Sequence, residues 1–331
     1  MKDNIPSLCK RYSDYFTIGA AVNARTINTH QGLIKKHFAS ITAENEMKPI
    51  SIYPRKGKYT FDKADAIVDF AVENNKLVRG HTLVWHNQTG DHIFLDDEGN
   101  RVSSEILMSR LRDYMIKVFD HFGTKVFCWD VVNEAIEDKG SKLLRDTRWL
   151  EILGENYLSD IFKMARELNP DTLLFYNDYD AVKPAKRDKI YTLLTDMKKQ
   201  DTPLDGVGIQ GHWNIKDFKY DDIRAAIEKY ASLDLDIHVT ELDISVYGKD
   251  DKDMRLEEPT DEMIEQQNEF YEEIFTIFRE YSDVIKNVTL WGVADDETWL
   301  DNFPEKNRKN WPLLFDEEHQ PKEEFWKVVE F

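Results

Sequence analysis

Two glutamates stand where apolar runs of the chain stop. Glu134 ends the run that begins at Val126, and Glu241 follows the run from Leu235 to Val239. Both runs have the composition of a buried strand, so each carboxyl group is expected at the carboxyl end of a strand. Two such groups are the equipment for hydrolysing a glycosidic bond, because one protonates the leaving oxygen while the other acts as nucleophile or base. The pair therefore indicates a glycosidase.

The elements that position these residues alternate regularly along the chain. Short β-rich runs predict eight strands, at 16–21, 40–44, 77–83, 126–132, 173–177, 206–210, 236–242 and 287–291. Apolar residues recur with helical spacing between them, at 62–75, 103–122, 188–199 and 260–281. Alternation of this kind predicts parallel βαβ units, and the count of eight favours a closed (β/α)8 TIM barrel of the α/β class. No linker or short repeat interrupts the pattern, which predicts a single domain over residues 1–331.

Polar and aromatic residues gather at the ends of the predicted strands. In a barrel the carboxyl ends of all strands open on one face, so these side chains would meet at one mouth. Aromatic rings stack on the apolar faces of sugars, while amides, lysines and carboxylates hydrogen-bond the hydroxyl groups. The composition is thus typical of a sugar-binding site. The residues concerned are Glu44, Asn45, Lys48, His81, Trp85, Gln88, Asn133, Asn177, Tyr179, Gln210, His212, Asp243, Trp291 and Trp299.

Six segments, in order along the chain, carry a resemblance to a known family. They are Thr-Ala-Glu-Asn-Glu-Met-Lys at 42–48, Gly-His-Thr-Leu-Val-Trp-His at 80–86, Trp-Asp-Val-Val-Asn-Glu at 129–134, Tyr-Asn-Asp-Tyr at 176–179, Gly-Ile-Gln-Gly-His at 208–212 and His-Val-Thr-Glu-Leu-Asp at 238–243. With these the chain resembles the glycoside hydrolase family 10 endo-1,4-β-xylanases, over nearly its whole length. The resemblance implies a TIM barrel that cleaves internal β-1,4 bonds of xylan or of imported xylo-oligosaccharides with retention of configuration.

The resemblance also implies roles for individual residues. It makes Glu134 the acid/base and Glu241 the nucleophile. His212 is expected to hydrogen-bond Glu241, with Asp243 orienting the histidine, and Asn133 to bond the sugar 2-hydroxyl. The glycone side would be lined by Glu44, Asn45, Lys48, His81, Trp85 and Trp299. The cleavage point would lie near Gln210 and Trp291, the aglycone side would involve Tyr179, and Gln88 is a further candidate for substrate contact.

Two departures from the family pattern concern substrate contacts. The run at 87–92 reads Asn-Gln-Thr-Gly-Asp-His, which places His92 where the family often has a tryptophan. Asp180 follows Tyr179 where asparagine is common. We expect these changes to affect subsite affinities and not the reaction.

Composition limits the possible partners. The 44 basic and 63 acidic residues give a net charge of -19, which argues against nucleic acid or an anionic membrane as a partner. No apolar run approaches the roughly 20 residues that span a bilayer. Two cysteines, Cys9 and Cys128, do not make a disulfide framework. The first residues lack the apolar core of a signal peptide, which favours the cytoplasm, although a secreted chain after processing would look the same.

Three alternatives to a xylanase can be compared with the sequence. A metallohydrolase is disfavoured because His81 and His86 lack metal-ligand spacing. The expected chemistry of two carboxylates requires neither a metal nor an organic cofactor. A non-enzymatic sugar sensor would tend to lose one of the two glutamates. A β-1,4-glucanase or an exo-acting β-xylosidase is the serious rival, because discrimination of xylose from glucose rests on sterics near Trp299 and Lys48. The remaining histidines are expected to be structural: His30, His37, His121, His238 and His319.

Overall fold

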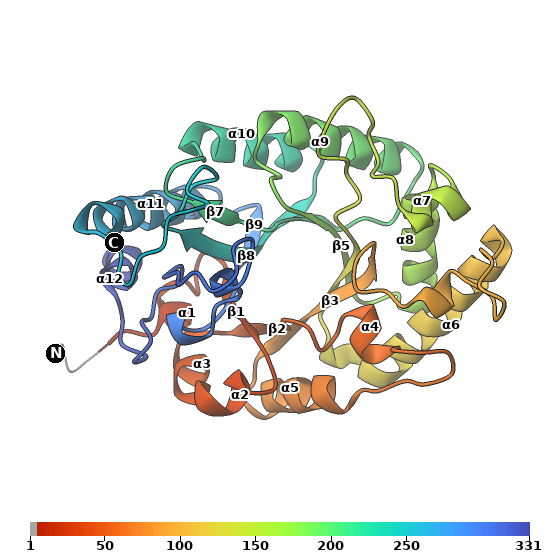
Figure 1. Ribbon diagram of the computed structural model, residues 1–331, viewed down its shortest axis with the longest axis horizontal. Coiled ribbons are helices and arrows are strands. Elements are labelled where there is room, and N and C mark those ends of the chain that lie inside the picture. The colour runs from red at the N-terminus through yellow and green to blue at the C-terminus, as the bar shows by residue number, and fades with distance from the viewer. Residues whose placement is uncertain (1–4) are drawn as a thin grey trace.

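The computed structural model describes residues 5–331 and contains a closed barrel of eight parallel strands (Figure 1). The barrel strands are β1 (Thr17–Val22), β2 (Ser40–Ala43), β3 (Leu77–Trp85), β4 (Cys128–Asn133), β5 (Leu173–Asp178), β6 (Gly206–Ile209), β8 (Asp236–Ser245) and β9 (Ile285–Leu290). Consecutive barrel strands pair in order, and β9 returns to pair with β1, which closes the cylinder. The predicted TIM barrel is confirmed.

Helices surround the strands on the outside of the barrel (Figure 1). They are α1 (Leu8–Arg11), α2 (Thr26–Thr29), α3 (Gln31–His37), α4 (Pro49–Ile52), α5 (Asp62–Glu73), α6 (Ser104–Phe122), α7 (Arg148–Leu153), α8 (Tyr157–Leu168), α9 (Pro184–Lys199), α10 (Tyr220–Ala231), α11 (Asp261–Glu280) and α12 (Glu323–Val329). Short 3₁₀ turns are η1 (Asp91–Ile93), η2 (Gly123–Lys125), η3 (Asp295–Glu297) and η4 (Trp299–Asp301). Within residues 5–331, none of the helices combines the length and apolar content needed to cross a membrane.

The element boundaries differ from the predicted ones for local reasons. Helix α9 starts at Pro184 instead of 188, because proline suits the first helical turn. Strand β4 begins only at Cys128, since the 3₁₀ turn η2 precedes it. Strand β8 runs three residues beyond the predicted 242, because an additional short strand, β7 (His212–Asn214), pairs with its end. That ninth strand lies outside the barrel cylinder and was not predicted.

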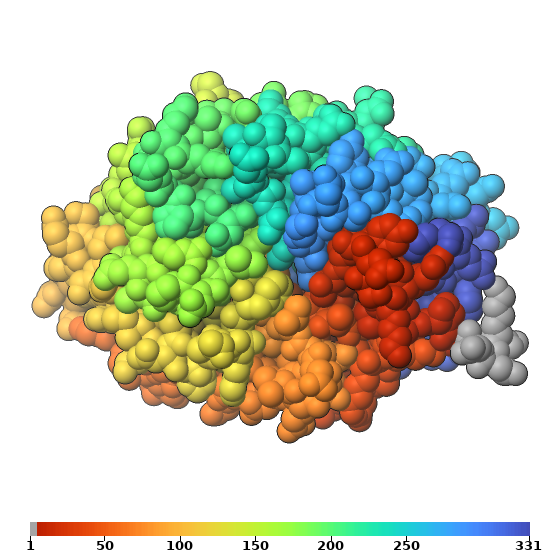
Figure 2. Space-filling model, turned by 180° about the vertical axis from the view of Figure 1, so that it is seen from behind, coloured from red at the N-terminus to blue at the C-terminus, as the bar shows by residue number. Residues whose placement is uncertain are grey.

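The packed interior is continuous from one end of the chain to the other. A single large cluster of buried apolar side chains extends from Leu8 to Val329, as expected for one domain. The N-terminal and C-terminal segments lie side by side, red and dark blue in Figure 2. The Tyr12 hydroxyl donates to the Val328 carbonyl oxygen at 2.6 Å, which joins the two segments directly. The two ends of the chain therefore stabilise the barrel near the pairing of β1 with β9.

Candidate active site

Glu134 is held in an unusual backbone conformation immediately after β4. Its φ is +58°, a region that a residue with a side chain adopts only when the surroundings impose it. The surroundings here are residues of β5: Glu134 donates its backbone N–H to the Asn177 carbonyl oxygen at 2.9 Å. The next amide, of Ala135, donates to the Tyr176 hydroxyl at 3.1 Å. The turn thus aims the carboxyl group away from the path of the strand.

The carboxyl group of Glu134 contacts one donor on each oxygen. Trp85 Nε1 donates to Oε2 at 2.8 Å, and Gln210 Nε2 donates to Oε1 at 2.9 Å. The donors come from the end of β3 and from the residue after β6. The side chain is half-buried, so it is oriented by protein groups and still open to a ligand. This is the geometry required of a group that exchanges protons with a substrate.

Glu241 lies within β8 and is almost completely buried, with 4% of its surface exposed. Asn177 Nδ2 donates to Oε1 at 2.8 Å, and His212 Nε2 donates to Oε2 at 3.0 Å. Burial alone would raise the pKa of Glu241, but the hydrogen bond from His212, the nearby His81 and the other contacts lower it to about 2. Glu241 is therefore an anion at neutral pH, as a nucleophile must be.

His212 is positioned by a second buried carboxylate. Asp243 Oδ2 accepts hydrogen bonds from His212 Nδ1 at 2.9 Å and from Trp299 Nε1 at 2.8 Å. Burial would lower the pKa of His212, but the charge of Asp243 and the hydrogen bonds to both carboxylates raise it to about 10. The imidazole is then a cation that donates from both ring nitrogens. The contacts predicted among His212, Glu241 and Asp243 are all present.

A row of side-chain amides connects the two glutamates. Asn177 Nδ2 lies 2.9 Å from Asn133 Oδ1, which in turn lies 3.4 Å from Gln210 Nε2. Thr240 Oγ1 donates to Asn177 Oδ1 at 2.7 Å and fixes the orientation of that amide. A Cβ at Gly208 would come within 2.2 Å of Asn177 Oδ1, so glycine is required there. Sequence reasoning noted Asn177 only as a strand-end residue and missed its contact with Glu241.

Lys48 extends this site towards Glu44. Its ammonium donates to Asn45 Oδ1 at 3.0 Å and lies 5.2 Å from the centre of the Trp85 ring. Burial lowers the pKa of Lys48, although the charges of Glu241 and other carboxylates oppose that change. Burial also raises the pKa of Glu44, whose Oε2 accepts from Asn23 Nδ2 at 3.3 Å. Asn23 is a contact that the sequence reading did not include.

A buried polar layer supports the site from within the barrel. His81 Nδ1 lies 2.9 Å from Asp130 Oδ2, and Asp130 also forms an ion pair with Arg79. Arg79 Nη1 donates to His238 Nδ1 at 2.6 Å. Trp291 packs edge-on against His81, with ring centres 5.5 Å apart, and against His212. Sequence reasoning missed Arg79 and Asp130, whose partners come from other strands.

Tyr179 belongs to a separate charged group beyond the end of β5. Its hydroxyl donates to Asp138 and accepts from Arg145 Nη2 at 2.7 Å. The Lys186 ammonium lies 3.3 Å from the centre of its ring. The next residue, Asp180, has a φ of +51° and pairs with Lys183 at 2.7 Å. Asparagine and aspartate tolerate this backbone conformation better than most residues, so the substitution there preserves the turn.

Gln88 and His92 lie in the loop after β3. The Gln88 side chain is exposed, while the backbone carbonyl oxygen of Gln88 accepts from the Ile50 amide at 2.8 Å. Among the described hydrogen bonds and ion pairs, none joins its side chain to either glutamate. The His92 ring packs edge-on against Tyr53, with centres 4.4 Å apart. The His92 ring thus packs the loop after β3 against the residue that follows α4.

Comparison with known proteins identifies the family. The model for glycosyl hydrolase family 10 matches residues 7–331. The chain belongs to this family. It is 52% identical to endo-1,4-β-xylanase B of Paenibacillus barcinonensis, and the match covers 99% of both chains. It is 48% identical to an endo-1,4-β-xylanase of Geobacillus stearothermophilus, again over 99% of both chains. A crystal structure of the P. barcinonensis xylanase XynB, in complex with a conduramine derivative, superposes with a TM-score of 0.97 and 99% coverage of each chain.

Membership of family 10 confirms two predictions made from the sequence. The chain is a glycoside hydrolase, and its family retains the configuration at the anomeric carbon. Among residues 5–331, one group of histidines and carboxylates is close enough to share a metal ion, and it contains neither Glu134 nor Glu241. The candidate active site around Glu134 and Glu241 contains carboxylates, amides, the His212 imidazole and aromatic rings.

Replacing His212 is expected to move the acid limb of the pH–rate profile to higher pH. As the expected nucleophile, Glu241 has to be ionised; the His212 hydrogen bond lowers its pKa to about 2, whereas burial raises the pKa. His212→Asn keeps Glu241 buried but removes the positive charge of the imidazole, so the pKa of Glu241 should rise. As the pH is lowered, kcat/KM should therefore begin to fall at a higher pH than in the parent. Asp243→Asn should shift the limb in the same direction. The test compares the pH–rate profiles of the parent and both variants on an activated aryl-β-xyloside, after their Tm values have shown that they are folded. Identical acid limbs in parent and variants would contradict the role of His212 in lowering the pKa of Glu241.

Proposed function

We propose that this protein is an endo-1,4-β-xylanase, which hydrolyses internal bonds of xylan or xylo-oligosaccharides by double displacement. The observation that carries the proposal is the state of Glu241, a buried carboxylate kept ionised by His212 and linked through amides to Glu134. Full-length similarity to proteins named endo-1,4-β-xylanase supports the choice of substrate.

In the first step Glu241 attacks the anomeric carbon of the xylose unit on the glycone side. Glu134 donates its proton to the glycosidic oxygen as the carbon–oxygen bond breaks, so the departing sugar leaves as a neutral alcohol. The product is a xylosyl ester of Glu241 with inverted configuration. Formation of the ester removes the negative charge that His212 and Asn177 stabilise, and both side chains stay in place to receive it again.

In the second step Glu134 is a carboxylate and acts as base. It removes a proton from a water molecule, which attacks the anomeric carbon and displaces Glu241. A second inversion restores the original configuration. The Asn133 amide, next to Glu134 in the chain and within hydrogen-bond distance of Asn177, is our candidate for bonding the sugar 2-hydroxyl.

Recognition of xylose is proposed to rest on the groups around Lys48 and Trp299. Lys48 is buried against Trp85, and Trp299 is fixed by its hydrogen bond to Asp243. The Trp299 ring also stacks on Phe303, with ring centres 5.1 Å apart. We propose that these aromatic rings and the buried ammonium limit the space for the hydroxymethyl group that distinguishes glucose from xylose. One such steric difference typically changes kcat/KM by roughly 10- to 200-fold.

The test is a time course of products from xylohexaose, with cellohexaose and an aryl-β-xyloside in parallel. We expect internal cleavage to two-, three- and four-sugar products, and cellohexaose cleaved more slowly by roughly the 10- to 200-fold given above. Glu241→Ala, purified in the same way, controls for contaminating hydrolases. NMR of the first product should show the β-anomer.

Other outcomes would select the alternative functions. Steady release of xylose alone would make the enzyme an exo-acting β-xylosidase. Comparable rates on cellohexaose would indicate a β-1,4-glucanase. No cleavage of any of the three substrates by folded protein would favour a sugar sensor.

A further inference from the structure

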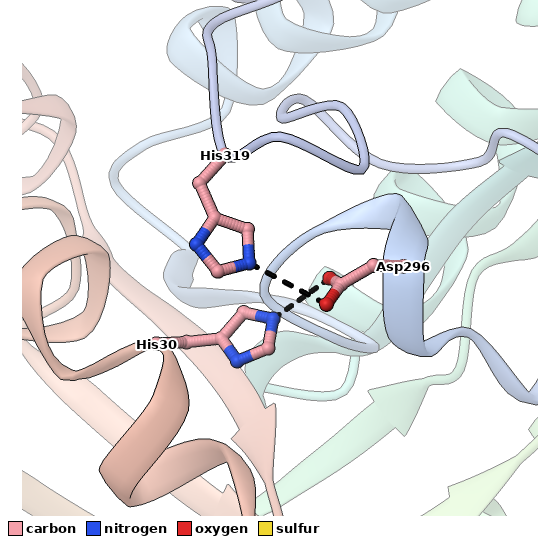
Figure 3. A group of neighbouring side chains, drawn as sticks. All are labelled: His30, Asp296 and His319. Carbon is pink, nitrogen blue, oxygen red and sulfur yellow. Dashed lines mark hydrogen bonds and ion pairs between the residues drawn. The ribbon is translucent and has the colours of Figure 1, made fainter.

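Three side chains that are distant in the sequence meet beside the loop after β9. His30 lies between α2 and α3, Asp296 lies in η3, and His319 lies in the loop before α12. One nitrogen from each ring and one carboxylate oxygen all lie within 4.8 Å of one another. Figure 3 shows both rings directed at the Asp296 carboxylate. Two imidazoles and a carboxylate are ligands that zinc prefers in proteins.

His30 is held as a ligand before any ion arrives. The residue is buried, with 1% of its surface exposed, and its Nδ1 lies 2.7 Å from Thr29 Oγ1. The Thr29 hydroxyl donates to the Arg25 carbonyl oxygen at 3.3 Å, so its oxygen accepts a hydrogen bond from the N–H at His30 Nδ1. Nε2 is then left with a lone pair, in the arrangement that metal-binding histidines generally have.

The lone pair of His30 faces a carboxylate. Nε2 is 2.8 Å from Asp296 Oδ1, where two lone pairs repel each other unless a cation is present. A proton on His30 Nε2 would remove the repulsion between His30 and Asp296, but it would not provide a partner for His319. The second histidine is what favours a metal ion over a proton.

His319 completes the group from the other side of Asp296. Its Nε2 atom is inaccessible to solvent and has no hydrogen-bond partner among residues 5–331, although a third of the side chain is exposed. The atom lies 3.4 Å from Asp296 Oδ2, and the two imidazole ring centres are 4.2 Å apart. A hairpin turn holds the residue, because Asp316 accepts from the amides of Glu318 and Gln320 at 3.0 and 2.7 Å.

We propose that His30 Nε2, His319 Nε2 and the Asp296 carboxylate bind a divalent transition-metal ion of the zinc type, with a water molecule as fourth ligand. Two ligands at the usual zinc distance in a tetrahedral site are about 3.3 Å apart, close to the 3.4 Å between His319 and Asp296. The distance between His30 Nε2 and Asp296 Oδ1, 2.8 Å, must increase by about half an ångström to reach that spacing. The nitrogen ligands disfavour calcium and magnesium, which take oxygen ligands.

The bound ion would stabilise the fold and help to position neighbouring loops. It would connect the segment after β1 with two C-terminal loops, on the side where β1 pairs with β9 to close the barrel. Glu297, next to Asp296, accepts from Asn23 Nδ2 at 3.0 Å, and the same amide nitrogen donates to Glu44. Metal binding would thus stabilise the loop that carries Trp299 and restrain the neighbours of Glu44.

The experiment uses untagged, chelator-treated protein at pH 7.5. Titration with Zn²⁺ should show one ion per chain by calorimetry and by native mass spectrometry. At a hundredfold excess over Kd the Tm should rise by roughly 3 °C or more. Co²⁺ in place of Zn²⁺ should produce the visible absorption bands of a tetrahedral site, which report on the ligands without reference to activity.

Two variants and a control make the test specific. His319→Gln and Asp296→Asn should each weaken Zn²⁺ binding at least about 10-fold and abolish the cobalt bands. His121→Gln is the matched control, because His121 Nε2 also contacts a carboxylate, Asp65 at 2.6 Å, but within residues 5–331 no third ligand group lies close enough to share an ion with them. It should bind the metal as the parent does.

Several outcomes would overturn the proposal. One is that the parent protein binds no stoichiometric Zn²⁺. Another is that the parent, His319→Gln and Asp296→Asn bind Zn²⁺ equally well. A Tm difference between parent and variants that depends on pH and not on zinc would instead make the group a proton-dependent contact. Should either variant fail to fold, the other variant and the cobalt spectrum of the parent still decide.

Discussion

Replacing Glu241 by alanine is expected to lower kcat/KM on xylo-oligosaccharides by on the order of 10⁶-fold, because removal of a catalytic nucleophile costs about that much. The remaining active site still binds sugar but has no group to attack the anomeric carbon. Asn177 Nδ2 and His212 Nε2 each lose an acceptor, so some loss of Tm accompanies the loss of rate. Glu241→Gln keeps the shape of the side chain and should be equally inactive, which separates loss of the charge from loss of packing.

Azide distinguishes a nucleophile from a residue that only supports the site. In Glu241→Ala the space left by the carboxylate admits azide, which attacks an aryl-β-xyloside from the same face as Glu241 did. One displacement occurs, so the product should be the α-xylosyl azide. Formation of the β-xylosyl azide, or rates close to those of the parent, would contradict the assignment of Glu241 as nucleophile.

Replacing Glu134 by alanine is expected to affect substrates according to their leaving groups. Xylo-oligosaccharides need a proton on the departing oxygen, so their cleavage should slow by about 10³- to 10⁴-fold, the upper range for a general acid. An aryl xyloside with an acidic phenol needs no such help in the first step and should lose far less. The two losses are compared as kcat/KM ratios on both substrates, with Tm as the check on folding. Equal losses would argue against an acid role.

The second step gives Glu134 a further signature. Without a base to activate water, the xylosyl ester of Glu241 should accumulate, which a burst of phenol and the protein mass would both show. Azide needs no base and should accelerate turnover, and after two displacements the product should be the β-xylosyl azide. Opposite anomers from the two variants would therefore separate the two roles within a single assay.

The barrel and its two glutamates follow from local features of the sequence. Strands and helices differ in their apolar periodicity, so eight alternating units are recognisable without knowing any contact. Side chains at the carboxyl ends of barrel strands share one face, so strand-end glutamates at 134 and 241 can be placed together from topology alone. The family segments extended this to His212 and Asp243, whose contacts with Glu241 the structure contains.

Other parts of the site depend on which strands become neighbours. Asn177 contacts Glu241 only because Gly208 leaves room for its amide, and Arg79 meets His238 across 159 residues of chain. The protonation states depend on the same contacts. Burial raises the pKa of Glu241, whereas His212 lowers it, and the outcome depends on distances that no sequence pattern specifies.

The fold class, the positions of the two catalytic candidates and the family resemblance are predictable from the amino-acid sequence, because periodicity and strand-end placement are properties of neighbouring residues. The ionised state of Glu241 and the contact between His30 and Asp296, which are 266 residues apart, depend on tertiary contacts. His30 and His319 were expected to be structural, since an isolated histidine carries no sign of its partners. Closure of the barrel between β1 and β9 brings them together, and long-range closure is what local patterns do not encode.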